Sequence, residues 1–211
     1  MLQINNLELF YGDQNIFELK SLNIENNKSV IGIVGNNGSG KSSLMKIIAG
    51  IENEYTGSIK NNFTTLYFEQ NYFKSNLIKV SGGEFCKQQI IDAFKKDCNL
   101  LILDEPTVHL DYDNRQFLIK AIKHFKGVVL LVTHDRELIK ETADKIIEIK
   151  DKKITLFDMK YEAFLFEKEN LFKQKELEVF HYKKHKNKLE KELEMRKIHS
   201  QKNKWKTKMN E

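Results

Sequence analysis

Proline is nearly absent from this sequence, cysteine is scarce, and glycine is missing from its C-terminal part. The only proline is Pro106, and none of the ten glycines lies beyond Gly127. Because these two residue types most often interrupt helices, the C-terminal part carries no helix breaker. The two cysteines, Cys86 and Cys98, fit no metal-binding spacing, and we expect reduced thiols in a cytoplasmic protein.

Long apolar runs and a leader-like N-terminus are also missing. No run of about 18 apolar residues occurs, which argues against a membrane-spanning helix. The first residues, MLQINNLELF, lack a basic segment followed by an apolar one, so no signal peptide is expected. With 211 residues, 40% of them hydrophobic, the chain can form one sizeable core, or one domain with an appendage.

The net charge of +5 is unevenly distributed. Residues 163–211 hold 14 of the 35 Lys and Arg residues but only 8 of the 30 Asp and Glu residues. The first 162 residues are therefore close to neutral, and the C-terminal part carries the basic excess. Together with the missing glycines, this predicts a domain over residues 1–160 and a basic helical extension over residues 161–211.

The segment SVIGIVGNNGSGKSSLMKIIAGI gives the strongest indication of function. Residues 30–34 form a short apolar run typical of a buried strand, and apolar spacing over residues 44–48 predicts a helix that ends near Gly50. Between them, eight residues fit the phosphate-loop pattern G-x-x-x-x-G-K-[ST]: Gly35, Asn36, Asn37, Gly38, Ser39, Gly40, Lys41 and Ser42.

The chemistry of this loop suits a nucleotide. The glycines let backbone N–H groups turn toward phosphate oxygens, and the helix N-terminus adds its dipole. Lys41 can reach the outer phosphates, and the Ser42 hydroxyl can ligate Mg²⁺. The alternative is a chance glycine loop, but the strand before it and the helix after it favour ATP binding.

An acidic pair ends a second apolar run, in NLLILDEPTVHLD. Ligands of open parallel sheets bind at the carboxyl ends of strands, so we expect Asp104 and Glu105 near the phosphates. Asp104 suits a Mg²⁺ ligand, and Glu105 suits a base that polarises the attacking water. The alternative is a pair that caps the next helix.

Two further side chains are predicted at strand ends. His134 follows the apolar run of residues 128–132 and could stabilise the γ-phosphate, although a histidine there is often structural. Gln70 ends the β-like run TLYFEQ and could ligate Mg²⁺ or water, but a single glutamine carries little information.

In this order, the phosphate loop, Gln70, VSGGE, LILDEPT, HLD and THDR resemble an ATP-binding cassette (ABC) ATPase domain. The resemblance implies an α/β P-loop NTPase fold with an N-terminal antiparallel β subdomain. It also implies that Tyr11 stacks on adenine, with Phe10 as a less suitable substitute. The alternative for Tyr11 is a half-buried aromatic of a strand.

The stretch KVSGGEF has no pocket-forming neighbours, and the resemblance explains it. In this family the Ser-Gly-Gly loop faces the γ-phosphate bound by a second ABC domain, so Ser81, Gly82 and Gly83 are expected to contact a partner's ATP. Asp111 matches the loop that crosses between the two domains. The resemblance thus implies a working unit of two ABC domains, either a homodimer or this domain with a second one.

Three features are similar to the ABC-F branch, whose members act on ribosomes. EPTVHLD with THDREL resembles its EPTNHLD and SHDRxFL patterns, although Val108, Thr133 and Leu138 depart from them. The charged segment after residue 160 resembles the start of the ABC-F interdomain linker. Only eleven positions separate Gln70 from Ser81, which implies a reduced helical subdomain.

The resemblance implies an ATPase of the ABC-F type, either a translation factor or an antibiotic-resistance ribosomal protection protein, that reaches the ribosome or RNA through residues 161–211. Leu165, Phe172 and Val179 recur every seven residues and predict one apolar stripe on a long helix. The basic end near Trp205 could meet RNA, or could be a solvated helix end. Two alternatives for the chain are the ATPase subunit of a membrane transporter and a truncated half-protein that needs a second ABC domain.

Overall fold

The computed structural model of the chain describes residues 1–69, 82–108 and 110–208. It divides into two compact units, Met1–Phe164 and Leu165–Glu211. Gln70 and Ser81 lie outside the described residues, as does the segment between them that was predicted to be a reduced helical subdomain.

The first unit is built on a nine-stranded sheet with the order β4-β1-β2-β9-β8-β3-β7-β6-β5. The strands are β1 (Leu2–Tyr11), β2 (Gln14–Ile24), β3 (Ser29–Gly35), β4 (Thr56–Asn61), β5 (Thr65–Phe68), β6 (Leu100–Asp104), β7 (Val128–Val132), β8 (Lys145–Lys150) and β9 (Lys153–Phe157). The β1 strand pairs with β2 and β4 in antiparallel fashion, whereas β3, β5, β6, β7 and β8 form parallel pairs. The predicted strands of residues 30–34, 100–103 and 128–132 therefore lie side by side in the parallel part of this mixed sheet.

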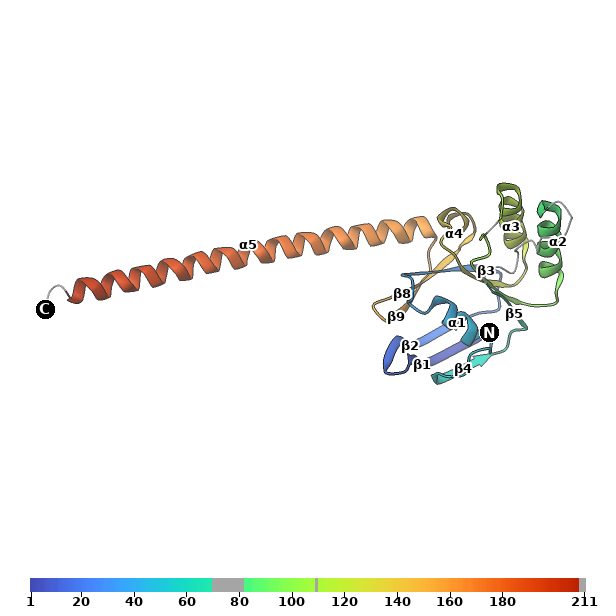
Figure 1. Cartoon of the computed structure of the whole chain (residues 1–211), viewed down its shortest axis with the longest axis horizontal. Coiled ribbons are helices and arrows are strands. Elements are labelled where there is room, and N and C mark those ends of the chain that lie inside the picture. Colours follow the sequence, from blue (N-terminus) through green and yellow to red (C-terminus); the bar gives the residue numbers. More distant parts are fainter. Residues whose placement is uncertain (70–81, 109, 209–211) are drawn as a thin grey trace. The chain divides into compact units, whose positions relative to one another are not determined.

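Helices cover both faces of this sheet (Figure 1). They are α1 (Lys41–Ile48), α2 (Gly82–Lys95), α3 (Tyr112–His124) and α4 (Arg136–Thr142), followed by the long α5 (Tyr161–Lys208). The buried side of α1 packs against one face of the central strands, and those of α2 and α3 pack against the other. Such burial on both faces requires continuous apolar strands, as in LLIL and VVLLV.

The β6 strand shows how the two layers share one strand. Leu100 and Ile102 belong to the core cluster that contains the α1 side chains, whereas Leu101 and Leu103 belong to the cluster beneath α2 and α3. Because successive side chains of a strand point to opposite faces, Asp104 follows on the same face as Ile102, the face covered by α1. The end of β6 thus presents its carboxylate on the side where the phosphate loop enters α1.

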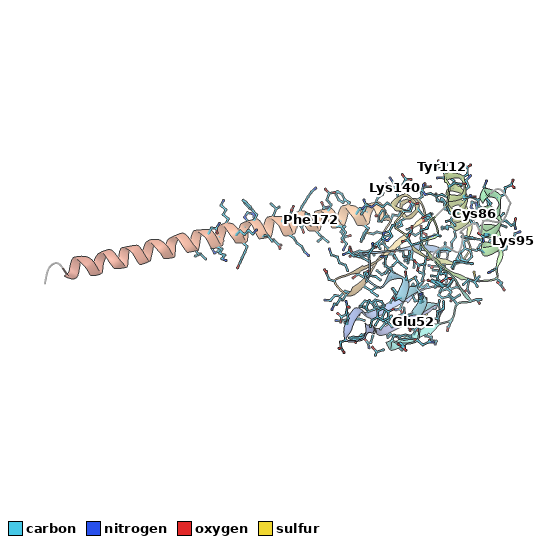
Figure 2. The ribbon with its side chains drawn as sticks, in the orientation of Figure 1. Glu52, Cys86, Lys95, Tyr112, Lys140 and Phe172 are labelled. Atoms are coloured by element: carbon cyan, nitrogen blue, oxygen red, sulfur yellow. The ribbon has the colours of Figure 1, made fainter. Side chains whose placement is uncertain are left out.

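The first turn of α5 belongs to the first unit. Tyr161 and Phe164 are buried with Ile139 and Ile146, and the Phe164 ring meets the Phe157 ring edge-on at 5.1 Å between centroids. From Leu165 onward the apolar side chains that are described are exposed, among them Phe172 (Figure 2). None of the described helices combines the length and apolar character needed to cross a membrane.

The α/β fold class predicted from the sequence is confirmed, including the antiparallel strands near the N-terminus and the long C-terminal helix. The helix predicted near Gly50 is α1, which ends at Ile48. Gly50 follows with a φ of +73°, a left-handed conformation that glycine adopts without strain. Local sequence therefore sets where α1 begins and ends.

Candidate functional site

The phosphate loop connects the last residue of β3, Gly35, to the first residue of α1, Lys41. Gly40 precedes the helix with a φ of +92°, and a Cβ there would lie 2.6 Å from the Phe17 ring. Gly38, with a φ of +77°, has nothing within 4 Å of its Cβ position. The loop is thus pressed against the β2 strand at Gly40 and open at Gly38, where a phosphate could approach the backbone.

Lys41 is held beneath this loop and is only 8% exposed. Its Nζ donates hydrogen bonds to the carbonyl oxygens of Gly35 and Asn36, both at 3.0 Å. Burial lowers the pKa of Lys41, and the nearby carboxylates of Glu105 and Asp104 act in the opposite direction. The lysine is therefore fixed by the loop backbone and lies in the field of the acidic pair.

A cavity of about 660 Å³ opens over the loop. Among its lining residues are the predicted site residues Tyr11, Asn37, Gly38, Gly40, Lys41, Ser42, Asp104, Glu105 and His134. The remaining lining residues are Ile16, Ser43, Val108 and Val132. The structure thus gathers side chains from four separate motifs around one space of a size common for small-molecule sites.

Tyr11 stands at the end of β1 with 53% of its surface exposed. Its hydroxyl lies 3.0 Å from Ser43 Oγ, on α1. Tyr11 lines the cavity and Phe10 is not among the lining residues, so the geometry favours Tyr11 as the aromatic that a base could contact. About half of its surface is exposed at the end of a strand, so Tyr11 also matches the alternative of a half-buried strand aromatic, and its stacking on adenine stays a prediction.

Asp104 and Glu105 diverge because the chain turns between them. Asp104, 4% exposed, is the last residue of β6, whereas Glu105 has a φ of +50° and its N–H bonds to the Val132 carbonyl at 2.8 Å. A non-glycine residue in this conformation is uncommon and often marks a functional site. Neither carboxylate caps α3, since that helix has Asp111 as its N-cap residue.

Glu105 is paired with His134. The backbone N–H of His134 donates to Glu105 Oε2 at 3.2 Å, and His134 Nε2 lies 3.5 Å from Oε1, an ion pair only when the imidazole is protonated. Glu105 Oε1 is a buried oxygen without a hydrogen-bond partner among the described residues. An acceptor left open at the edge of the cavity suits the role of binding and polarising a water.

Gly35, Asn36 and Ser39 belong to the phosphate loop but are not among the residues that line this cavity. The other predicted residues lie elsewhere or outside the described residues. Asp111 accepts a hydrogen bond from the Asn114 N–H at 2.8 Å and caps α3, and it is not among the described residues that line the cavity. Gly82 and Gly83 open α2. Gln70 and Ser81 have no described position.

Two residues that do not line the cavity but contact Asp104 or the residue after His134 were not predicted from the sequence. The Tyr67 hydroxyl, on β5, donates to Asp104 Oδ2 at 3.1 Å. Arg115, on α3, donates to both carboxylate oxygens of Asp135, at 2.5 and 2.7 Å, directly after His134. Both contacts join segments far apart in the chain, so no local pattern could have indicated them.

The residues present fit ATP and Mg²⁺. Ser42 and Asp104 supply a hydroxyl and a carboxylate, the hard oxygen ligands that Mg²⁺ prefers. Ser39 Oγ, within the loop, is a buried polar atom without a hydrogen-bond partner among the described residues. A phosphate in the cradle would give such atoms partners.

Comparisons with known proteins agree with this geometry. The family model described as ABC transporter matches residues 19–71. The Ribosome protection protein VmlR of Bacillus subtilis (strain 168) is 31% identical over an alignment of 202 residues that covers 84% of this chain and 37% of that protein. ABC transporter F family member 2 of Arabidopsis thaliana is 30% identical over 207 residues, covering 78% of this chain and 30% of that protein.

A solved structure gives the same result for the fold. RNase-L Inhibitor superposes with a TM-score of 0.61 at 25% identity, over 76% of this chain and 40% of that one. The chain spans only about a third of the length of the curated relatives named above. Within that span, the motifs, the cavity and the similarities agree, and the chain belongs to the ABC ATPase family, with members of its F branch among its relatives.

Proposed function

We propose that this chain binds and hydrolyses ATP as an ABC-F-type domain that acts on the ribosome. Residues 1–160 form the ATP-binding domain in this proposal, and residues 161–211 form a linker-like extension. The observation that carries it is that Lys41, Glu105 and His134 line one cavity. The similarity to a ribosome protection protein supports the ribosome as the proposed target.

Each residue around the cavity has a proposed task. The backbone of residues 35–40 and Lys41 hold the phosphates, and Tyr11 stacks on adenine. Ser42, Asp104 and Gln70 would hold Mg²⁺, which neutralises charge on the phosphates when bound. Glu105 polarises the attacking water through the open Oε1 atom, and His134 stabilises the γ-phosphate.

The proposed partner is a second ABC domain, either from a second copy or from another chain segment. Ser81, Gly82, Gly83 and Asp111 would contact the ATP held by that partner. The described start of α2 at Gly82 is compatible with this task, because its N-terminal N–H groups suit an anion. The second proposed partner is ribosomal RNA, which the basic excess of the extension favours.

Nucleotide binding is tested with Lys41→Ala. The substitution removes a cation beneath the phosphate loop, so Mg-ATP binding should be lost in calorimetric titration. Lys46→Ala is the matched control, because Lys46 is an exposed lysine in the last turn of the same helix and should bind ATP as the parent does. Unchanged affinity in Lys41→Ala would refute the phosphate-loop assignment.

The ribosomal target is tested by co-sedimentation with ribosomes, with and without ATP, in the Glu105→Gln background. We expect ATP-dependent, salt-sensitive binding that is lost when the chain is cut after Phe164. Cutting there keeps Tyr161 and Phe164, which are buried in the first unit. Equal binding by the shortened chain would remove the extension from the proposal, and no binding by either chain would favour a transporter ATPase.

The partner domain is tested by light scattering. Glu105→Gln with Mg-ATP should dimerise, since ATP contacted from both sides links binding to association. Ser81→Arg should block the dimer and leave ATP binding to the monomer intact, because Ser81 would serve the other domain's site. Loss of ATP binding by the Ser81→Arg monomer would show that the loop serves its own chain.

A further inference from the structure

Tyr67 is placed beside Asp104 by strand pairing. The β5 and β6 strands are parallel with Tyr67 opposite Ile102 and Phe68 opposite Leu103. Residues opposite one another share a face of the sheet, and so do residues two apart on one strand. Tyr67, Ile102 and Asp104 therefore lie on the same face, the one that α1 and the phosphate loop cover.

The contact between the two side chains is a directed hydrogen bond. The Tyr67 hydroxyl donates to Asp104 Oδ2 at 3.1 Å, and the Tyr67 ring packs against the apolar cluster that contains Ile102. Asp104 is buried, so its carboxylate has little water to orient it. A buried carboxylate held by a phenol has one preferred orientation instead of several.

The Tyr67 hydroxyl is the donor in this contact, since an ionised carboxylate can only accept. Burial raises the pKa of this hydroxyl well above the usual range, and the negative charge of Asp104 and the hydrogen bond to it act in the same direction. At neutral pH a phenol carries its proton, so the Tyr67 hydroxyl has a hydrogen to donate to Asp104 Oδ2.

We propose that Tyr67 is a positioning residue for the magnesium site of this ATPase, which rests on the function proposed above. By occupying Oδ2, the Tyr67 hydroxyl fixes the Asp104 carboxylate so that its remaining lone pairs face the side where Ser42 lies. Hydrogen bonds to metal-ligating carboxylates orient the ligand, and their loss typically weakens metal affinity by about 10–100-fold. Tyr67 does not itself touch the nucleotide in this proposal.

The test compares ATP affinity of the full chain in excess Mg²⁺ with its affinity in a chelator. Tyr67→Phe removes one hydroxyl and keeps the ring. We expect unchanged affinity in chelator and a roughly tenfold smaller gain from Mg²⁺. The matched control is Tyr55→Phe, since Tyr55 packs against the same apolar cluster and no contact of its hydroxyl with the site is found among the described residues.

A second measurement isolates the contact with Asp104. In the Asp104→Asn background, the Tyr67→Phe change should have no further effect on the gain from Mg²⁺, because the carboxylate it orients is gone. The inference is overturned if Tyr67→Phe keeps the parental gain in ATP affinity from Mg²⁺, or if it lowers that gain equally in the parent and Asp104→Asn backgrounds. A Tyr67→Phe chain that fails to fold overturns it as well. A parent chain that binds no ATP overturns the proposed function itself.

Discussion

The two units of this chain are stabilised in different ways. In Met1–Phe164, strands β3, β6 and β7 have apolar side chains buried on both faces, and helices cover them. In the second unit, the described residues 165–208 belong to the single helix α5, and their described apolar side chains are exposed. Long-range burial defines the first unit, whereas only local interactions within the helix are described for the second.

The exposed apolar residues of the extension do not form the single stripe predicted from the sequence. Leu165, Phe172 and Val179 recur every seven residues, but other apolar side chains are exposed as well and, at 100° per residue, lie on other sides of the helix, namely Phe166, Leu177 and Phe180. Local pairs support the helix instead. Glu169 and Lys173 form an ion pair one turn apart at 2.7 Å, in the favourable order of charges.

The largest effect is expected for a substitution that tests whether ATP hydrolysis depends on the first unit alone. Glu105→Gln removes the proposed base and should slow ATP hydrolysis about 10²–10⁴-fold, with ATP binding retained. Steady-state phosphate release should fall by the same factor in the full chain and in the chain cut after Phe164. Each chain is measured under conditions in which its counterpart with Glu105 hydrolyses ATP. Glu18→Gln, exposed on β2, is the control and should hydrolyse at the parental rate. A parental rate for Glu105→Gln would mean that Glu105 is not the base.

The next effect concerns stability of the first unit. Leu130, on β7, is 0% exposed and lies in the cluster beneath α1. Leu130→Ala removes buried methyl groups and leaves a cavity, so the free energy of unfolding should fall by about 2–5 kcal/mol in denaturant titration. A loss below about 1 kcal/mol would show that this core is less tightly packed than its burial indicates.

An intermediate effect is expected at the contact between α3 and α4. Burial alone would raise the pKa of Asp135, but hydrogen bonds from Arg115 and from the N–H groups of Leu138 and Glu137 hold it below its usual range. Arg115→Ala leaves this mostly buried carboxylate without its cation, and should cost about 2 kcal/mol at neutral pH. Lys123→Ala, which breaks an exposed pair with Glu141, should cost at most about 0.5 kcal/mol.

The pH dependence of that difference follows from the lowered pKa. The contribution of Asp135 is complete above its unfolded-state pKa of about 4 and is lost as the pH falls through its lower, folded-state pKa. The gap in stability between the parent and Arg115→Ala should therefore be constant at neutral pH and shrink below about pH 4. A gap that persists at acidic pH would assign the loss to packing of the Arg115 stem.

The sequence predicted the features that depend on neighbouring residues. The apolar run before Gly35 and the spacing after Lys41 gave the strand, loop and helix at their observed places. The absence of glycine and proline after Gly127 predicted the uninterrupted α5. Such features depend on backbone conformation over a few residues, which local composition determines.

Features set by strand pairing or by a turn could not be predicted in this way. The hydrogen bond from Tyr67 to Asp104 depends on β5 lying beside β6, and strand order is not local. The left-handed conformation of Glu105 depends on its bond to Val132, on another strand. The burial of Tyr161 and Phe164 likewise depends on α4, so the sequence could not indicate that the first turn of α5 packs within the first unit.

The smallest effect is expected for a leucine-to-alanine substitution in the extension. Leu177, in α5, is 59% exposed, so Leu177→Ala removes few packed contacts. Alanine is at least as good a helix former as leucine, so helicity by circular dichroism should not fall, and the free energy of unfolding should change by at most about 0.5 kcal/mol. Leu130→Ala and Leu177→Ala remove the same atoms, so the difference between their losses in free energy of unfolding measures the contribution of burial. A loss above about 1 kcal/mol for Leu177→Ala would mean that this leucine is covered in solution, and a loss that grows with protein concentration would identify a second copy as the cover.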